Sequence, residues 1–306
     1  MACYLHHHVC RRPKGETVSK IILFSAILFS RAALFAQTEL TDESGMTLHE
    51  RISGSGSTLG FISKLDTALG YQFNRYVAVE GGLPFYTVHP SSSVSQTTGA
   101  QPATGIGNAY GDLRLTLLNP AVNLTSLFTV SAPTGDKNTG FSTGHVTYDW
   151  SNLFDRSFGS VTPFVDLGIA NTITDTPFFV RPFSSYGFVT HVEGGAHYRL
   201  ARIFSVGASV YAIEPSGQQT VYSKLIRGNA QNPGGGHGHH GVFDASGQTV
   251  GTAAITRDEG FSGWFSARLS RYAFFEIGYS RSIEYALNGV FFGIDLNLSP
   301  LVRGFH

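Results

Sequence analysis

Recurring stretches of about ten residues alternate between apolar and polar side chains, and this pattern constrains the fold more than any other feature. In residues 188–200, FVTHVEGGAHYRL, the even positions are small, apolar or aromatic, whereas the odd positions include two histidines, a glutamate and an arginine. A period of two is typical of a β-strand, whose neighbouring side chains face opposite ways. Similar alternation recurs at 59–73, 76–87, 111–119, 124–133, 146–155, 161–171, 204–214, 261–270, 273–284 and 289–298.

The connections between these stretches alternate between short and long. The short links are 74–75, 119–123, 156–160, 200–203 and 269–272, and the long ones are 89–110, 136–144, 174–187 and 217–260. Bacterial outer-membrane barrels have tight periplasmic turns and longer extracellular loops, and closure leaves no unpaired backbone edge in the hydrocarbon. The sequence therefore predicts an all-β fold, a closed antiparallel transmembrane β-barrel with apolar side chains toward lipid and charged ones toward the lumen.

The number of strands follows from the direction of the chain. Eleven stretches alternate clearly, and the last of them would end on the periplasmic side. An N-terminus delivered from the periplasm needs one more ascending strand before 59–73, and the candidate is 46–54, MTLHERISG, although its apolar face is weak. We therefore expect 12 strands, an even number as in bacterial barrels; ten is the alternative.

The first 36 residues have the pattern of a signal peptide. A basic stretch, RRPKGETVSK, precedes the apolar run IILFSAILFS, and RAALFAQ offers a cleavage point after Ala36. We expect residues 1–36 to be removed, 37–45 to form a short periplasmic lead and 46–306 to form a single barrel domain. Both cysteines lie in the removed part, so the mature chain would have no disulfide. The remainder is mildly acidic and has no basic patch for nucleic acid.

The strand register places a set of ionisable and aromatic side chains in the lumen. The predicted lumen-lining set is Lys64, Asp66, Glu80, Arg114, Asp149, Asp166, His191, Glu193, His197, Arg199, Trp264, Arg268, Glu276 and Asp295. One interpretation is a polar passage whose charges tune selectivity. The other is an interior filled by paired arginines and carboxylates, since partly buried charges demand partners.

Two further sites follow from the residue pattern. The longest loop contains GGGHGHHG, and His237, His239 and His240 could ligate a divalent metal, although glycine- and histidine-rich loops are also common as solvated tips. No other cofactor is expected. A lipase-like site would need adjacent serine and histidine with an orienting group, and His89-Pro90-Ser91 offers none, so we expect no enzyme activity.

Two segments resemble a known family. The stretches TGIGNAYGDLRLTLLN (104–119) and SAPTGDKNTGFSTG (131–144), with GGLPFYTV (81–88), are similar to the outer-membrane proteins grouped under meta-pathway phenol degradation. The resemblance implies a barrel that passes small, often aromatic or apolar compounds. Near the end of the chain, GIDLNL resembles the terminal-strand signal read by the barrel assembly machinery.

These observations lead to one functional expectation and one rival. We expect a channel or transporter in the bacterial outer membrane for passive passage of small molecules, with membrane lipids, the assembly machinery and a small solute as partners. The alternative is a closed structural barrel whose loops mediate surface interactions.

Overall fold

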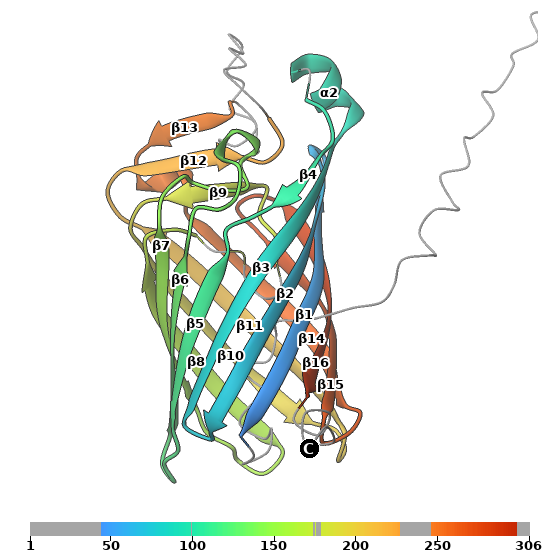
Figure 1. The fold of residues 1–306 in the computed structure, drawn as a ribbon, viewed down its shortest axis with the longest axis vertical. Helices are drawn as coiled ribbons and strands as arrows, with labels where there is room; N and C mark the ends of the chain where they lie inside the picture. Colours follow the sequence, from blue (N-terminus) through green and yellow to red (C-terminus); the bar gives the residue numbers. More distant parts are fainter. Residues whose placement is uncertain (1–43, 99, 174, 176–178, 227–245, 299–306) are drawn as a thin grey trace, which may run out of the picture.

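A closed antiparallel barrel is the main feature of the fold (Figure 1). The computed structural model describes residues 44–98, 100–173, 175, 179–226 and 246–298. The wall consists of β1 (Gly45–Ser57), β2 (Gly60–Asn74), β3 (Val77–Pro90), β5 (Tyr110–Leu117), β6 (Asn123–Ser131), β7 (Thr147–Asp155), β8 (Val161–Ala170), β10 (Val189–Arg199), β11 (Phe204–Pro215), β14 (Asp258–Arg268), β15 (Ala273–Ser282) and β16 (Leu287–Asn297). Each pairs with the next, and β1 pairs with β16 to close the ring. The predicted closed barrel of 12 strands is confirmed, and the alternative of ten is wrong.

The period-two pattern decides which side chains face outward. In β2, Lys64 is 6% exposed on the inside while its neighbour Leu65 is 39% exposed on the outside. Large apolar side chains such as Val210 and Val290 are exposed in the same way on other strands. In water such a surface would be costly, but lipid accepts it. The barrel therefore has the outer surface of a membrane protein.

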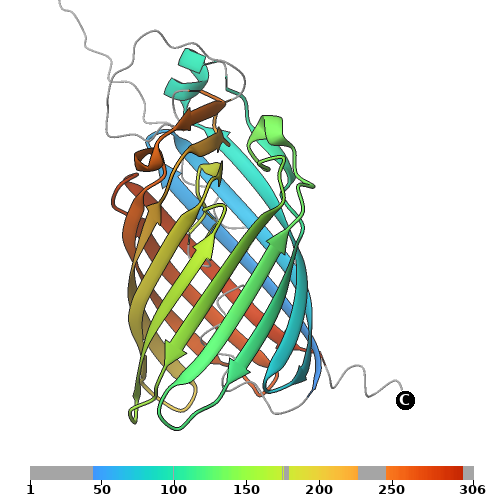
Figure 2. The same cartoon turned by 90° about the vertical axis from the view of Figure 1, so that its left-hand side faces the viewer.

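The two ends of the barrel differ, as the loop lengths predict. Short hairpins join the strands at one end, which Figure 2 shows at the bottom of the barrel. Exposed aromatic side chains lie beside these hairpins, including Tyr71, Phe73, Tyr76, Phe154 and Tyr198. Aromatic rings favour the boundary between lipid and water, so these side chains mark one edge of the membrane. The short hairpins identify this end as the periplasmic one, and the long connections are extracellular.

Pro84 lies inside β3 without breaking the barrel. Its partner on one side is Asp66 of β2. On the other side, β5 pairs with β3 only as far as Gly82, and the short β4 (Ala103–Ile106) pairs from Phe85 onward. Proline lacks a backbone N–H, so it is tolerated where one ladder is interrupted.

The long extracellular connections fold into a cover over the barrel mouth (Figures 1 and 2). A separate sheet contains β9 (Phe183–Tyr186), β12 (Gln219–Ser223) and β13 (Gln248–Gly251). Outside the wall, the described residues also form α2 (Ser92–Thr98), η2 (Lys137–Thr139) and η4 (Ala253–Ile255). The sequence predicted only long polar loops here, so the small sheet is an addition to that expectation.

Apolar side chains hold this cover in place. Phe179, Val180, Phe183 and Ile226 are at most 1% exposed and belong to one cluster with inward residues of the wall strands. Burying a large apolar side chain contributes about 1.5–3 kcal/mol to the free energy of folding.

In the part of the chain that is described, no helix is long and apolar enough to cross a membrane.

Candidate functional site

The lumen contains a cavity beneath the extracellular cover, which we call the upper cavity. Its volume is about 340 Å³, within the range of small-molecule sites. Eight of the lumen residues predicted from the sequence line it: Lys64, Asp66, Glu80, Arg114, Asp149, Asp166, His191 and Glu193. Five charged or titratable residues that the sequence analysis did not single out also line it: His49, Arg51, Asp112, Asp175 and Lys224.

A second cavity of about 320 Å³, the lower cavity, lies near the periplasmic hairpins. Four more of the predicted residues line it, namely His197, Arg199, Arg268 and Glu276. Asp155 and Arg202 also contribute to its wall. The strand register therefore brings the predicted residues into two separate groups along the barrel axis.

An apolar layer lies where the two cavities meet, since Leu153 lines both of them. It consists of Leu153, Phe164, Trp264 and Phe291, each at most 4% exposed. Arg51 of the upper cavity forms an ion pair with Glu276 of the lower one, with 3.6 Å between Nη2 and Oε2. The predicted residue Trp264 belongs to the apolar layer, and its ring centroid lies 5.1 Å from that of His197, which lines the lower cavity.

Glycines determine how the rings of this layer lie. Each ring residue has a glycine directly opposite on the next strand, in the pairs Phe164–Gly195, Trp264–Gly207 and Phe291–Gly278. A Cβ atom at any of these glycines would overlap the facing ring. The rings therefore lie against the wall, where a larger residue would push them into the lumen. An inward aromatic beside an inward glycine is the signal in the sequence for this arrangement.

Ion pairs organise one side of the upper cavity. His49 lies between two carboxylates, with Nδ1 3.0 Å from Asp295 Oδ1 and Nε2 3.3 Å from Glu80 Oε2. Asp295, a predicted lumen residue, is 2% exposed and holds this histidine from β16. Alternation in β1 puts both His49 and Arg51 inside. That alternation is the sequence signal that would have found them, since odd positions of 46–54 face the lumen.

The opposite side of the upper cavity is richer in carboxylates. Asp149 Oδ1 lies 3.0 Å from His191 Nε2. Asp166 and Glu193 stand opposite each other on β8 and β10. Asp166 Oδ1 and Glu193 Oε1 are buried and have no hydrogen-bond partner among the described residues. These two predicted residues thus come together although they are 27 positions apart in the sequence.

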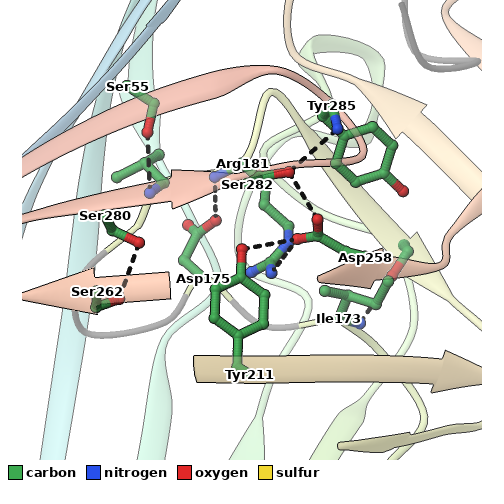
Figure 3. A network of polar contacts seen from close by, with 12 residues as sticks. Ser55, Ile173, Asp175, Arg181, Tyr211, Asp258, Ser262, Ser280, Ser282 and Tyr285 are labelled. Atoms are coloured by element: carbon green, nitrogen blue, oxygen red, sulfur yellow. Dashed lines mark hydrogen bonds and ion pairs between the residues drawn. The ribbon is translucent and has the colours of Figure 1, made fainter. Parts of the chain in front are cut away.

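A polar network anchors the cover to the barrel mouth (Figure 3). Arg181 donates from Nη2 to Asp258 Oδ2 over 2.8 Å, and both side chains are fully buried. Tyr211 and Ser282 donate to the same carboxylate, over 3.2 and 2.6 Å. Although burial alone would lower the pKa of Arg181, Asp258 raises it above its usual value. The guanidinium therefore stays charged in a buried position.

Asp175 anchors the cover at a second point. Its Oδ1 accepts a hydrogen bond from the Arg181 backbone N–H over 2.8 Å, and its Oδ2 accepts one from Tyr86 over 2.7 Å. Lys224 and Lys64 place their Nζ atoms 3.5 and 3.6 Å from Oδ2. Burial opposes the charged form, but the two ammonium groups and the hydrogen bonds hold the pKa of Asp175 below its ordinary value.

Burial also shifts the pKa of Lys224. Desolvation lowers the pKa of Lys224 to about 8, and the neighbouring Asp175 carboxylate opposes that shift. Sequence reasoning missed Asp175, Arg181 and Lys224 because their partners are distant along the chain. Charged residues next to the apolar PFFV and LI stretches of two long loops are the signal that could have marked them.

The predicted metal site and the predicted signal peptide lie outside the described residues. His237, His239 and His240 fall in 227–245, and residues 1–36 precede the first described position. Among the residues that are described, no three metal-ligating side chains converge on one point.

The architecture and the distribution of side chains define the class of protein. A closed antiparallel barrel with an apolar outer band and a charged interior is the architecture of bacterial outer-membrane proteins. The protein is therefore a porin-like β-barrel of the bacterial outer membrane.

Solved structures align with this chain at low sequence identity. An outer membrane channel from Pseudomonas putida F1 aligns with a TM-score of 0.52 and 11% identity over 83% of this chain and 96% of that one. The NanC porin aligns with a TM-score of 0.45 and 7% identity over 83% of this chain and 100% of that one. The CymD monoaromatic hydrocarbon channel gives 0.41 and 11%, over 89% and 94%. No family model and no curated protein matches the sequence.

Proposed function

We propose that the protein is a channel for passive passage of small molecules across the outer membrane. The observation that carries the proposal is the pair of cavities, about 340 and 320 Å³, which occupy the two ends of one charged lumen. A structural barrel has no need of such space, because side chains fill the interior of a small barrel. Polar walls together with open volume are what a solute pathway requires.

The walls also support a preference for aromatic or apolar solutes. Tyr86, Tyr110, Phe141, Phe183 and Tyr211 line the upper cavity beside the charged groups. The resemblance of 104–119 and 131–144 to the meta-pathway phenol degradation proteins agrees with this solute class. Rings that lie against the wall offer such solutes a surface to pack on.

The experiment is a flux measurement with the refolded mature chain. Liposomes that contain the protein should pass benzyl alcohol and small sugars faster than empty liposomes, and planar bilayers should show discrete conductance steps. A folded barrel that produces neither flux nor conductance would contradict the channel. That outcome would favour the rival function, a closed barrel whose cover mediates surface contacts. The sheet formed by β9, β12 and β13 over the barrel mouth is the observation that supports this rival.

We propose metal binding by His237, His239 and His240 as a separate function, supported by the residue types and by the glycines that flank them in the sequence. Zn²⁺ titration of the refolded protein tests it, with a variant that carries alanine at all three positions as the control.

A further inference from the structure

The carboxylates in and beside the upper cavity differ in their partners from one side of the barrel to the other. Around β1, β2, β3 and β16, the acidic side chains stand beside cationic or titratable nitrogen. Asp295 and Glu80 flank His49, and Lys64 Nζ lies 3.6 Å from Asp66 Oδ2. Arg114, which lines the same cavity, interacts with Glu80 and Asp295. Negative charge on this side is therefore balanced.

On β7, β8 and β10 the carboxylates outnumber the cationic or titratable nitrogen groups. Asp149, Asp166 and Glu193, which we call the acidic wall, have one histidine among them, His191. The histidine contacts Asp149 directly and also attracts Asp166 and Glu193, which stand opposite each other, so one titratable nitrogen group serves three carboxylates. The Ser209 hydroxyl and the backbone N–H groups of Asn152 and Leu167 interact with these two carboxylates, but Oδ1 of Asp166 and Oε1 of Glu193 have no hydrogen-bond donor in the described part of the chain. A buried carboxylate oxygen without a donor costs free energy that a ligand with a donor would recover.

We propose that the acidic wall makes the upper cavity a binding site for a small organic cation, an amine or ammonium group on an aromatic or apolar body. The inference rests on the proposed function, because it names a solute class for the same cavity. An ammonium group supplies charge-assisted hydrogen bonds to the two carboxylates. Rings in the same cavity accept the rest of the solute: Tyr211 stands opposite Glu193 on β11, and Tyr86 and Phe141 stack with 5.3 Å between their centroids.

The choice of an organic cation over a metal ion follows from geometry. No group of three metal-ligating side chains in the described residues is close enough to hold an ion. An ammonium group has its own hydrogen atoms and needs only two or three acceptors, and it can also stack its substituent on rings. The acidic wall and its neighbouring rings together match that requirement.

The sign of the charge is a property of the upper cavity and not of the whole lumen. In the lower cavity three arginines, Arg199, Arg202 and Arg268, line the wall together with the carboxylates Asp155 and Glu276. A solute that met only the lower cavity would find no acidic excess. We therefore expect the cation preference to depend on the acidic wall, and not on the net charge of the barrel.

Calorimetric titration of the refolded mature protein in detergent micelles tests the proposal. The probes are benzylammonium, benzyl alcohol and benzoate at pH 7 and equal ionic strength, with the heats in protein-free micelles subtracted. Benzylammonium should bind about tenfold more tightly than benzyl alcohol, the effect of one charge-assisted contact, and benzoate should bind least. Equal affinity for the amine and the alcohol would overturn the proposal.

Substitutions in the acidic wall test whether its carboxylates cause the preference for benzylammonium. The double substitution Asp166→Asn with Glu193→Gln should remove the preference for benzylammonium, and Glu193→Gln alone should reduce it. The matched control is Glu259→Gln, since Glu259 is exposed at the extracellular end of β14, outside the cavity. Native folding of each variant is checked by heat-modifiable gel migration. A preference that survives in a folded Glu193→Gln variant and in the folded double variant would also overturn the proposal.

Flux separates this inference from the proposed function. Tight binding of benzylammonium without flux would support the cation site and contradict the channel. Flux of benzyl alcohol and sugars with no preference for the amine in binding would support the channel and contradict the cation site.

Discussion

At the scale of single residues, glycine opposite an aromatic ring determines how much of the lumen stays open. Gly207 faces Trp264 across β11 and β14, and a Cβ atom there would overlap the indole. Gly263 is the neighbour of Trp264 in β14, yet its nearest atom would lie 3.8 Å from an added Cβ, an ordinary contact. An added methyl group would therefore displace the Trp264 ring at Gly207 but would fit without displacement at Gly263.

We predict that Gly207→Ala moves the Trp264 ring away from the wall and into the lumen. Overpacking of this kind costs about 1–3 kcal/mol. The chain has two tryptophans, so a Trp150→Phe background makes Trp264 the single fluorescent reporter. Its emission should shift to the red and channel conductance should fall. Gly263→Ala should change neither property; equal effects of the two substitutions would contradict the prediction.

At the scale of elements, the extracellular cover depends on a few buried charges. Asp175 holds Lys64 and Lys224 and binds the backbone of Arg181. Removal of one partner from a buried ion pair costs about 3–5 kcal/mol, because it leaves an uncompensated charge. Lys64 keeps Asp66, but Lys224 loses its carboxylate.

We predict that Asp175→Asn releases the cover while the barrel stays folded. Limited proteolysis of the refolded protein should then cut within 171–226 at least ten times faster, and the conductance should rise. The control is Glu284→Gln, an exposed carboxylate in the turn between β15 and β16. Cleavage at the wild-type rate in Asp175→Asn would show that the apolar cluster alone holds the cover.

Acid should act on the cover in the same direction. The pKa of Asp175 is depressed in the folded state, so its contribution to stability is complete above its unfolded pKa of about 4 and is lost as the pH falls through the folded value. We predict that loop cleavage by an acid-active protease accelerates below about pH 4 in the wild type. Asp175→Asn should show a weaker dependence on pH in that range. An identical acid response of the two proteins would contradict the assignment to Asp175.

At the scale of the whole molecule, the two ends of the barrel belong to different compartments. Ser246 precedes β13 in the cover, whereas Arg202 lies in the hairpin between β10 and β11. Both cysteines of the chain lie within the predicted signal peptide, so single cysteines can be placed without interference. We predict that a membrane-impermeant maleimide labels Ser246→Cys in intact cells but not Arg202→Cys. The reverse pattern would invert the topology.

The wall of the barrel was predictable because each strand carries its own evidence. The alternation of β2 or β10 can be seen within the strand itself. The pattern of β1 is weak, but a barrel with an even number of strands required one more strand before β2. The cover was not predictable, because β9, β12 and β13 have only four or five residues each and pair across distant positions. The same holds for Arg181, whose partner Asp258 lies 77 residues away.

The sequence by itself determined which side chains face lipid and which face the lumen, because a period of two in a closed barrel allows one assignment. It also determined the number of strands and the end with short turns. Only the tertiary structure decided which inward side chains meet. Asp166 and Glu193 share the acidic wall, and Arg51 and Glu276 connect two cavities, because strand register and barrel closure set distances that no local pattern contains.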